Sequence, residues 1–115
     1  MSNLSSLITV EEARQLQKNW INSRATDIEN ASGKEDVCEF LFSVDELQKF
    51  IDYIKKNSAS VNPGIRIYLA AYQNQNKDEA TVFMAPTQGV HLGSENDYDL
   101  QPLNRAVNGW PPKNY

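Results

Sequence analysis

The sequence predicts a small, two-layer α+β protein with elements in the order α-β-α-β-β and an extended C-terminal segment. Two capping-box motifs each precede apolar residues at helical spacing. Two runs rich in β-branched and aromatic residues flank a polar connection and predict an antiparallel hairpin. The periodic apolar pattern then fades after residue 87. Because helices and a small sheet each bury one apolar side, we expect both helices to pack on one face of the sheet.

The first helix is predicted over residues 10–30. Thr9 and Glu12 have capping-box spacing, in which the hydroxyl accepts from a backbone amide and the carboxylate reaches back to the cap. Apolar residues follow at helical spacing, and Gly33 supplies a C-terminal stop. The second helix is predicted from Ser43, the start of a second capping box, to the basic pair Lys55-Lys56. Its apolar stripe consists of Leu47, Phe50, Ile51 and Ile54.

Three strands are predicted, over residues 37–42, 65–72 and 80–85. Pro86 is expected to end the third, because proline cannot donate to a sheet ladder. If the first two strands share one sheet, the unit that they form with the second helix should be a right-handed crossover. On the second strand, one face is aliphatic and is the face we expect the helices to cover. It consists of Ile65, Ile67, Leu69 and Ala71.

The domain organisation follows from the composition. Residues 1–87 are predicted to form a single α+β domain of ordinary size. Residues 88–115 contain several glycines and prolines but also scattered large apolar residues. We therefore expect an extended C-terminal segment that wraps the domain or a partner.

The charge and cysteine content exclude several functions. The net charge is −4, and the longest basic run is Lys55-Lys56, which argues against nucleic-acid and anionic-membrane partners. The single Cys38 lies in an apolar run and is expected to be a buried thiol, so cysteine-based zinc sites and internal disulfides are excluded. No stretch is long and apolar enough to span a membrane, and no signal peptide is evident, so we expect a cytoplasmic protein.

The candidate binding residues lie on the second face of the 65–72 strand. Arg66, Tyr68 and Tyr72 share that face, and arginine-aromatic surfaces can bind carboxylates, phosphates or partner proteins. Trp110, in a Trp-Pro-Pro sequence, is a further candidate anchor. The alternatives are that the C-terminal segment covers this face, or that Arg66 holds a small anion or metabolite beside the tyrosines.

His91 is a weak metal or catalytic candidate. It is the only histidine, and Glu95, Asp97 and Asp99 follow it closely. The facial-triad type of metal site uses two histidines, however, so a solvated loop is the preferred interpretation and no cofactor is expected. A metal-dependent enzyme centred on His91 is kept as an alternative.

Four segments resemble parts of small uncharacterised bacterial proteins. They are CEFLFSVDEL at 38–47, NPGIRIYLAAY at 62–72, TVFMAPT at 81–87 and QPLNRAVNGWPP at 101–112. The resemblance implies a free-standing bacterial protein and no named activity. The sequence therefore predicts a non-catalytic interaction protein, with another protein or a second copy as partner, that uses the sheet face and the C-terminal segment.

Overall fold

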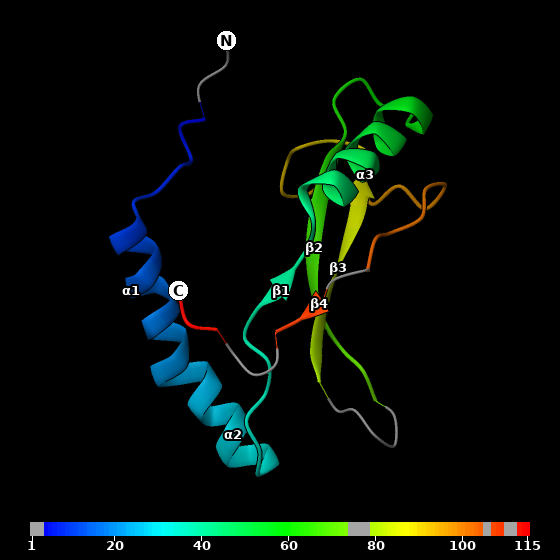
Figure 1. Ribbon diagram of the computed structural model, residues 1–115. Helices are drawn as coiled ribbons and strands as arrows, with labels where there is room; N and C mark the ends of the chain where they lie inside the picture. Colours follow the sequence, from blue (N-terminus) through cyan, green and yellow to red (C-terminus); the bar gives the residue numbers. More distant parts are fainter. Residues whose placement is uncertain (1–3, 74–78, 105–106, 110–112) are drawn as a thin grey trace.

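The computed structural model describes residues 4–73, 79–104, 107–109 and 113–115 (Figure 1). It confirms the α+β class. Its elements are α1 (Val10–Trp20), η1 (Ile21–Ala25), α2 (Thr26–Ser32), β1 (Phe40–Leu41), α3 (Val44–Asn57), β2 (Gly64–Ala71), β3 (Ala80–Thr87) and β4 (Val107–Asn108). Within the described ranges, no helix is both long and apolar enough to cross a membrane.

The predicted first helix is present, with an interruption. The Thr9 hydroxyl accepts from the Glu12 amide at 3.0 Å, and the Glu12 carboxylate accepts from the Thr9 amide at 3.2 Å, which completes the capping box. A π-helical turn, η1, then joins α1 to α2. The hydrogen bonds of a π-helix span one residue more than those of an α-helix. At this turn the Ile21 carbonyl accepts a hydrogen bond from the Thr26 hydroxyl at 2.8 Å. Gly33, with φ of +80°, ends α2 as predicted.

Helix α3 matches its prediction closely. The Ser43 hydroxyl accepts from the Glu46 amide at 2.9 Å, and Lys55 and Lys56 occupy the last turn. Its apolar stripe places Phe50 and Ile54 in a small core with Leu100. Tyr53, Met84 and Leu103 pack around that core. The C-terminal segment therefore supplies part of the core that α3 covers.

The hairpin of β2 and β3 is antiparallel, with Tyr68 opposite Phe83. The predicted end of the third strand at Pro86 is wrong, because β3 continues to Thr87. The Pro86 carbonyl accepts from the Asp97 amide at 2.9 Å. Its carbonyl and its nitrogen therefore face the outer edge of β3, away from β2. The missing N–H costs the hairpin no hydrogen bond.

The predicted first strand is shorter than expected and has a different partner. Of residues 37–42, Phe40–Leu41 forms a strand, and this strand pairs with β4 in its own two-stranded sheet. Strands β2 and β3 form the other sheet. The first two predicted strands therefore do not share a sheet, which the right-handed crossover over residues 37–72 would require. The pairing of β1 with β4 joins Leu41 to Val107, which lie far apart in the chain.

The prediction that both helices cover the aliphatic face of β2 is wrong. Exposure on that face rises along the strand, from 42% at Ile65 to 60% at Ile67 and 81% at Leu69. Val82 and Pro86, which pair with Leu69 and Ile65, are buried on the neighbouring strand. Met84, which pairs with Ile67, packs against the core around α3, whereas the β2 half of this face stays in solvent.

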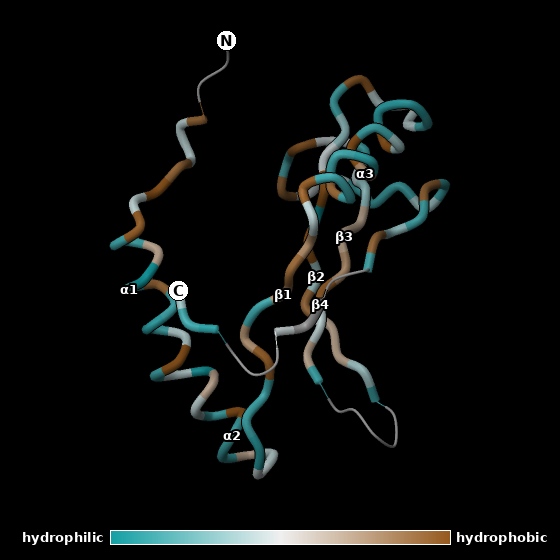
Figure 2. Tube along the Cα trace, in the orientation of Figure 1, coloured by the Kyte–Doolittle hydropathy of each residue, from teal (hydrophilic) through white to brown (hydrophobic). Residues whose placement is uncertain are grey.

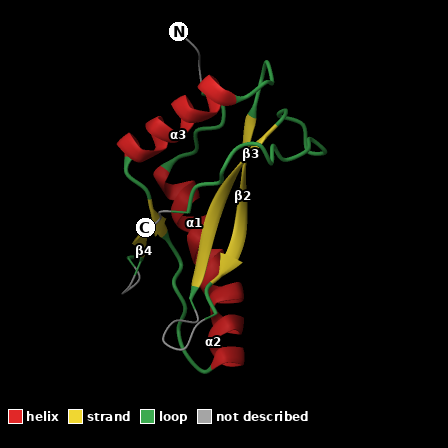
Figure 3. Ribbon diagram, turned by 90° about the vertical axis from the view of Figure 1, so that its right-hand side faces the viewer, coloured by secondary structure: helices red, strands yellow, loops and turns green. Residues whose placement is uncertain are grey.

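The molecule is more open than a typical domain of its length. Its radius of gyration is 16.4 Å, whereas about 13 Å is expected for 115 residues. Its accessible surface is 9250 Å², against about 6,300 Å² for a compact protein of 13.0 kDa. The helix of α1, η1 and α2 stands to one side of the hairpin (Figures 1 and 3), and hydrophilic positions recur along it (Figure 2). Much of this helix is therefore available for contacts.

Candidate functional site

Arg66 holds the loop that follows β3. Its Nη1 donates to the Asn96 side-chain oxygen at 2.7 Å. Its Nη2 donates to the backbone carbonyls of Ser94 at 2.9 Å and Leu92 at 3.1 Å. Both terminal nitrogens of the guanidinium are thus engaged within the chain. A small anion at Arg66 would have to share or displace these bonds.

Tyr68 belongs to the same network. Its ring stacks on Phe83 across the hairpin, with ring centroids 5.0 Å apart. The Asn96 amide nitrogen donates to the Tyr68 hydroxyl at 2.8 Å. Asn96 therefore accepts from Arg66 and donates to Tyr68, and fixes the orientation of both side chains.

This network gives a titration prediction for Tyr68. The hydrogen bond from Asn96 lowers the pKa of Tyr68 below its ordinary value of 10.0, Arg66 acts in the same direction, and desolvation opposes them. A lowered folded-state pKa means that the unfolded chain binds more protons just below pH 10. The ionisation of Tyr68 therefore adds stability only as the pH rises through its folded pKa, and contributes nothing at neutral pH.

We expect the Tyr68 ring-carbon NMR signal to titrate with a midpoint below pH 10.0, the ordinary pKa of a tyrosine side chain. Replacing Asn96 by alanine should move the Tyr68 midpoint upward, because the first cause of the shift is removed. An unchanged midpoint in the Asn96→Ala variant would show that the bond does not form in solution.

The other predicted binding residues lie apart from Arg66 and Tyr68. The Tyr72 hydroxyl donates to the Asn104 side chain at 2.9 Å, and the Asn104 amide donates to the Val82 carbonyl at 2.7 Å. Trp110 lies outside the described residues. The structure thus brings Arg66 and Tyr68 together, and it places Tyr72 against another part of the C-terminal segment. Their role in partner binding stays a prediction.

His91 lies in an exposed turn close to Arg66. Both residues line an open groove of about 480 Å³, together with Thr87 and Leu92. In the part of the chain that the structure describes, no three histidine, cysteine or acidic side chains gather as metal ligands. A metal-dependent reaction at His91 would therefore need ligands from elsewhere.

Sequence reasoning missed a basic, amide-rich face on α1. Residues 14–24 contain three cationic side chains and no acidic one, in a chain with a net charge of −4. Exposed polar positions of this range follow the helical repeat and form one face, which we call the α1 polar face. It consists of Arg14, Gln15, Lys18 and Asn19 on α1 and of Asn22 on η1. The signal was visible in the sequence as an acid-free stretch, but the cations are spaced four or more residues apart and form no run.

Local contacts order the α1 polar face. The Gln15 amide donates to the Asn19 side chain at 2.8 Å, one turn along the helix. The end of the chain lies beside it, since Arg14 Nε donates to the Tyr115 carbonyl at 3.4 Å. Lys18 makes no ion pair with any described residue. The face therefore presents cations and amide groups that can contact an anionic, hydrogen-bonding ligand.

The comparisons with known proteins give one kind of match. Over 74 residues, or 64% of this chain, the sequence is 31% identical to the tyrosine recombinase XerS from three strains of Streptococcus thermophilus. The aligned part is 20% of each relative, so the chain spans about a fifth of their length. No protein-family model matches the chain. No solved structure matches it either.

This similarity corrects the prediction about partners. We expected a protein partner or a second copy and excluded nucleic acid, but the matched relatives are recombinases, which process nucleic acid. The exclusion relied on the net charge of the whole chain. Electrostatic contacts are screened over about 8 Å at physiological ionic strength, so the local charge of the contacting face matters more than the total.

Proposed function

We propose that this protein is a non-catalytic binding module that contacts DNA through the α1 polar face. The observation that carries the proposal is the face itself, five exposed cationic and amide side chains on one side of a helix in an otherwise acidic protein. The similarity to tyrosine recombinases supports it. Because the chain spans only a fifth of those relatives, the proposal concerns binding and does not include recombination.

The dimensions of the face suit a DNA groove. Residues 14 to 22 rise about 12 Å along the helix axis, which corresponds to three or four base pairs. The major groove is about 12 Å wide and accepts an α-helix. Figure 1 shows α1 beside the hairpin, and the segment that a duplex would meet next to the face is the end of the chain at Tyr115, which accepts from Arg14.

The side chains suggest a division of roles. Arg14 and Lys18 supply charge for phosphate contacts, which set affinity. Gln15, Asn19 and Asn22 supply amide groups, the type that pairs with adenine edges in the major groove. With two cations on the face, we expect weak binding, with a dissociation constant of about 10⁻⁴ to 10⁻⁶ M. We place this activity in the cytoplasm.

The test is fluorescence anisotropy with a labelled 24-base-pair duplex, measured over a range of salt concentrations. The double variant Arg14→Gln/Lys18→Gln should bind more weakly than the unchanged protein. The slope of log affinity against log salt should become shallower by about 1.8, which is about 0.9 for each phosphate that the variant no longer neutralises.

The matched control is Lys55→Gln/Lys56→Gln, which changes the net charge equally but lies at the end of α3. It should leave the affinity nearly unchanged. Equal losses of affinity in both double variants would show that only total charge matters and would contradict a site on α1. Absence of binding by the unchanged protein, at low salt and millimolar concentration, would reject the proposed function.

A second candidate function is the binding of a small anion in the groove between Arg66 and His91. The observation that favours it is that both cationic or titratable side chains line one open groove of about 480 Å³. The bonds from Arg66 to the loop at 92–96 weigh against it. The Arg66 substitution considered in the Discussion separates the two roles.

A further inference from the structure

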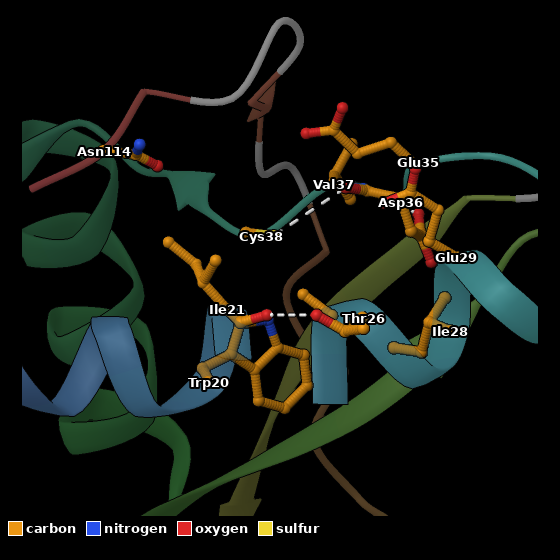
Figure 4. A pocket seen from close by; sticks show the side chains of 11 residues that line it. Trp20, Ile21, Thr26, Ile28, Glu29, Glu35, Asp36, Val37, Cys38 and Asn114 are labelled. Atoms are coloured by element: carbon orange, nitrogen blue, oxygen red, sulfur yellow. Dashed lines mark hydrogen bonds between the residues drawn. The ribbon is translucent and has the colours of Figure 1, made fainter. Parts of the chain in front are cut away.

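The inner side of the first helix faces a cavity that the proposed DNA contact does not use. This cavity has a volume of about 170 Å³ and lies between the helix and the segment of residues 35–38. Figure 4 shows Trp20, Ile21 and Thr26 on the helix side and Val37 and Cys38 across from them. An adjoining cavity of about 370 Å³ reaches the hairpin and shares Trp20, Ile28, Val37 and Cys38 with the first.

One polar group in this space has no partner in the described part of the chain. The Trp20 indole nitrogen, Nε1, is buried and makes no hydrogen bond to any described residue. A buried donor without a partner is unfavourable, and such groups are usually satisfied. Two of the neighbouring polar groups are already engaged. The Thr26 hydroxyl donates to Ile21, and one Asp36 oxygen accepts from the amides of Val37 and Ala80 at 2.7 and 3.1 Å.

The walls of the adjoining cavity are largely apolar and small. The second cavity is lined by aliphatic and aromatic side chains and by small residues of the hairpin, including Phe40, Ala70 and Ala80, and it opens to solvent beside Leu69, which is 81% exposed. A water molecule at Trp20 Nε1 would need two to four polar partners to be well held, and the walls of the adjoining cavity offer few. An apolar molecule with one hydrogen-bond acceptor would satisfy both the walls and the indole.

The charges at the rim select against anions. Glu29 and Glu35 line the first cavity and are exposed, and Asp36 lies beside them. No cationic side chain lines either cavity among the described residues. The two volumes together are of the size that holds a small organic ligand.

We infer that the Trp20 cavity is a binding site for a small, neutral, mainly apolar molecule whose carbonyl or similar acceptor takes the hydrogen bond from Trp20 Nε1. The π-helical turn supports this role, because such turns are frequent at functional sites and this one places Ile21 and Ala25 on the cavity wall. The inference is independent of the proposed DNA contact, which lies on the outer face of the same helix.

Three probes of one shape test it on the full chain. Acetophenone is neutral and has one carbonyl acceptor, ethylbenzene has no acceptor, and benzoate is an anion. The readout is the indole N–H signal of Trp20 in ¹H–¹⁵N NMR spectra. Acetophenone should move this signal in a saturable manner, whereas ethylbenzene should bind about tenfold more weakly and benzoate should not bind.

Two variants complete the test. Trp20→Phe keeps a ring but removes the N–H, so acetophenone should lose about tenfold in affinity, measured on the amide signals of Val37 and Cys38. Ala25→Leu fills the cavity and should abolish binding, with circular dichroism to confirm that the helix is retained. Equal binding of all three probes, or unchanged affinity in Trp20→Phe, would overturn the inference, as would the lack of any saturable shift with acetophenone.

Discussion

Replacing Ile54 by alanine is expected to lower the free energy of unfolding by about 2 to 5 kcal/mol. Ile54 is 3% exposed and packs with Phe50 and Leu100 in the core cluster. Because the core is small, few neighbours can move to fill the space left by the removed methyl groups. A thermal melt should show the loss as a fall in Tm of about 4 °C per kcal/mol for a chain of this length.

The matched control is Ile67→Ala, which removes the same atoms from a side chain that is 60% exposed. Its cost should stay within about 0.5 kcal/mol. Comparable losses of stability in the two variants would mean that the aliphatic face of β2 is covered in solution, as the sequence first suggested. The pair of variants therefore tests where the core lies.

Replacing Arg66 by methionine should lower the free energy of unfolding by about 2 kcal/mol. Three hydrogen bonds from its guanidinium are removed, and the Leu92 and Ser94 carbonyls and the Asn96 side chain lose their donor. Partial exposure of this network lets water replace some of the bonds, which limits the cost. We also expect faster amide hydrogen exchange at Gln88 and Asp97, whose amides donate to the Glu95 and Pro86 carbonyls around that loop.

Arg24→Met is the control, because Arg24 is exposed and makes no hydrogen bond or ion pair through its side chain within the described residues. It should leave Tm nearly unchanged. If Arg66→Met is also neutral, the guanidinium is not needed by the loop, and the small-anion function becomes the better explanation of Arg66. A clear loss of stability, with no effect on binding of added phosphate, would make Arg66 a structural residue.

The helices could be predicted because their signals are local. The Thr9 and Ser43 caps and the Gly33 stop depend on hydrogen bonds and dihedral angles within a few residues. The π-helical turn at Ile21–Ala25 was not predicted, since it has no period of its own and relies on the bond between Thr26 and Ile21. The hairpin was also predicted, apart from its continuation through Pro86.

The candidate site was predicted less well, for a different reason. Net charge and the longest basic run take no account of helix geometry. In a helix, Arg14 and Lys18 lie on one face because they are four positions apart. Counting charge by helical face would have found the α1 polar face. The network of Arg66, Tyr68 and Asn96 needed the structure, because Asn96 lies 28 positions from Tyr68.

The sequence by itself determined the α+β class, the helix ends, the hairpin and the acid-free stretch of the first helix, because each depends on neighbours a few residues apart. Only the tertiary structure decided which surfaces are buried. Leu100 joins the core, Leu103 pairs with Met84 of β3 and Val107 pairs with Leu41 of β1, while Ile67 and Leu69 stay in solvent. The Ser94 carbonyl in the loop that follows β3 also accepts from Arg66, and Asn114 joins Trp20 in the lining of the cavity on the inner side of the first helix. Contacts between residues so distant in the chain leave no repeating pattern among neighbouring residues, so the sequence alone does not predict them.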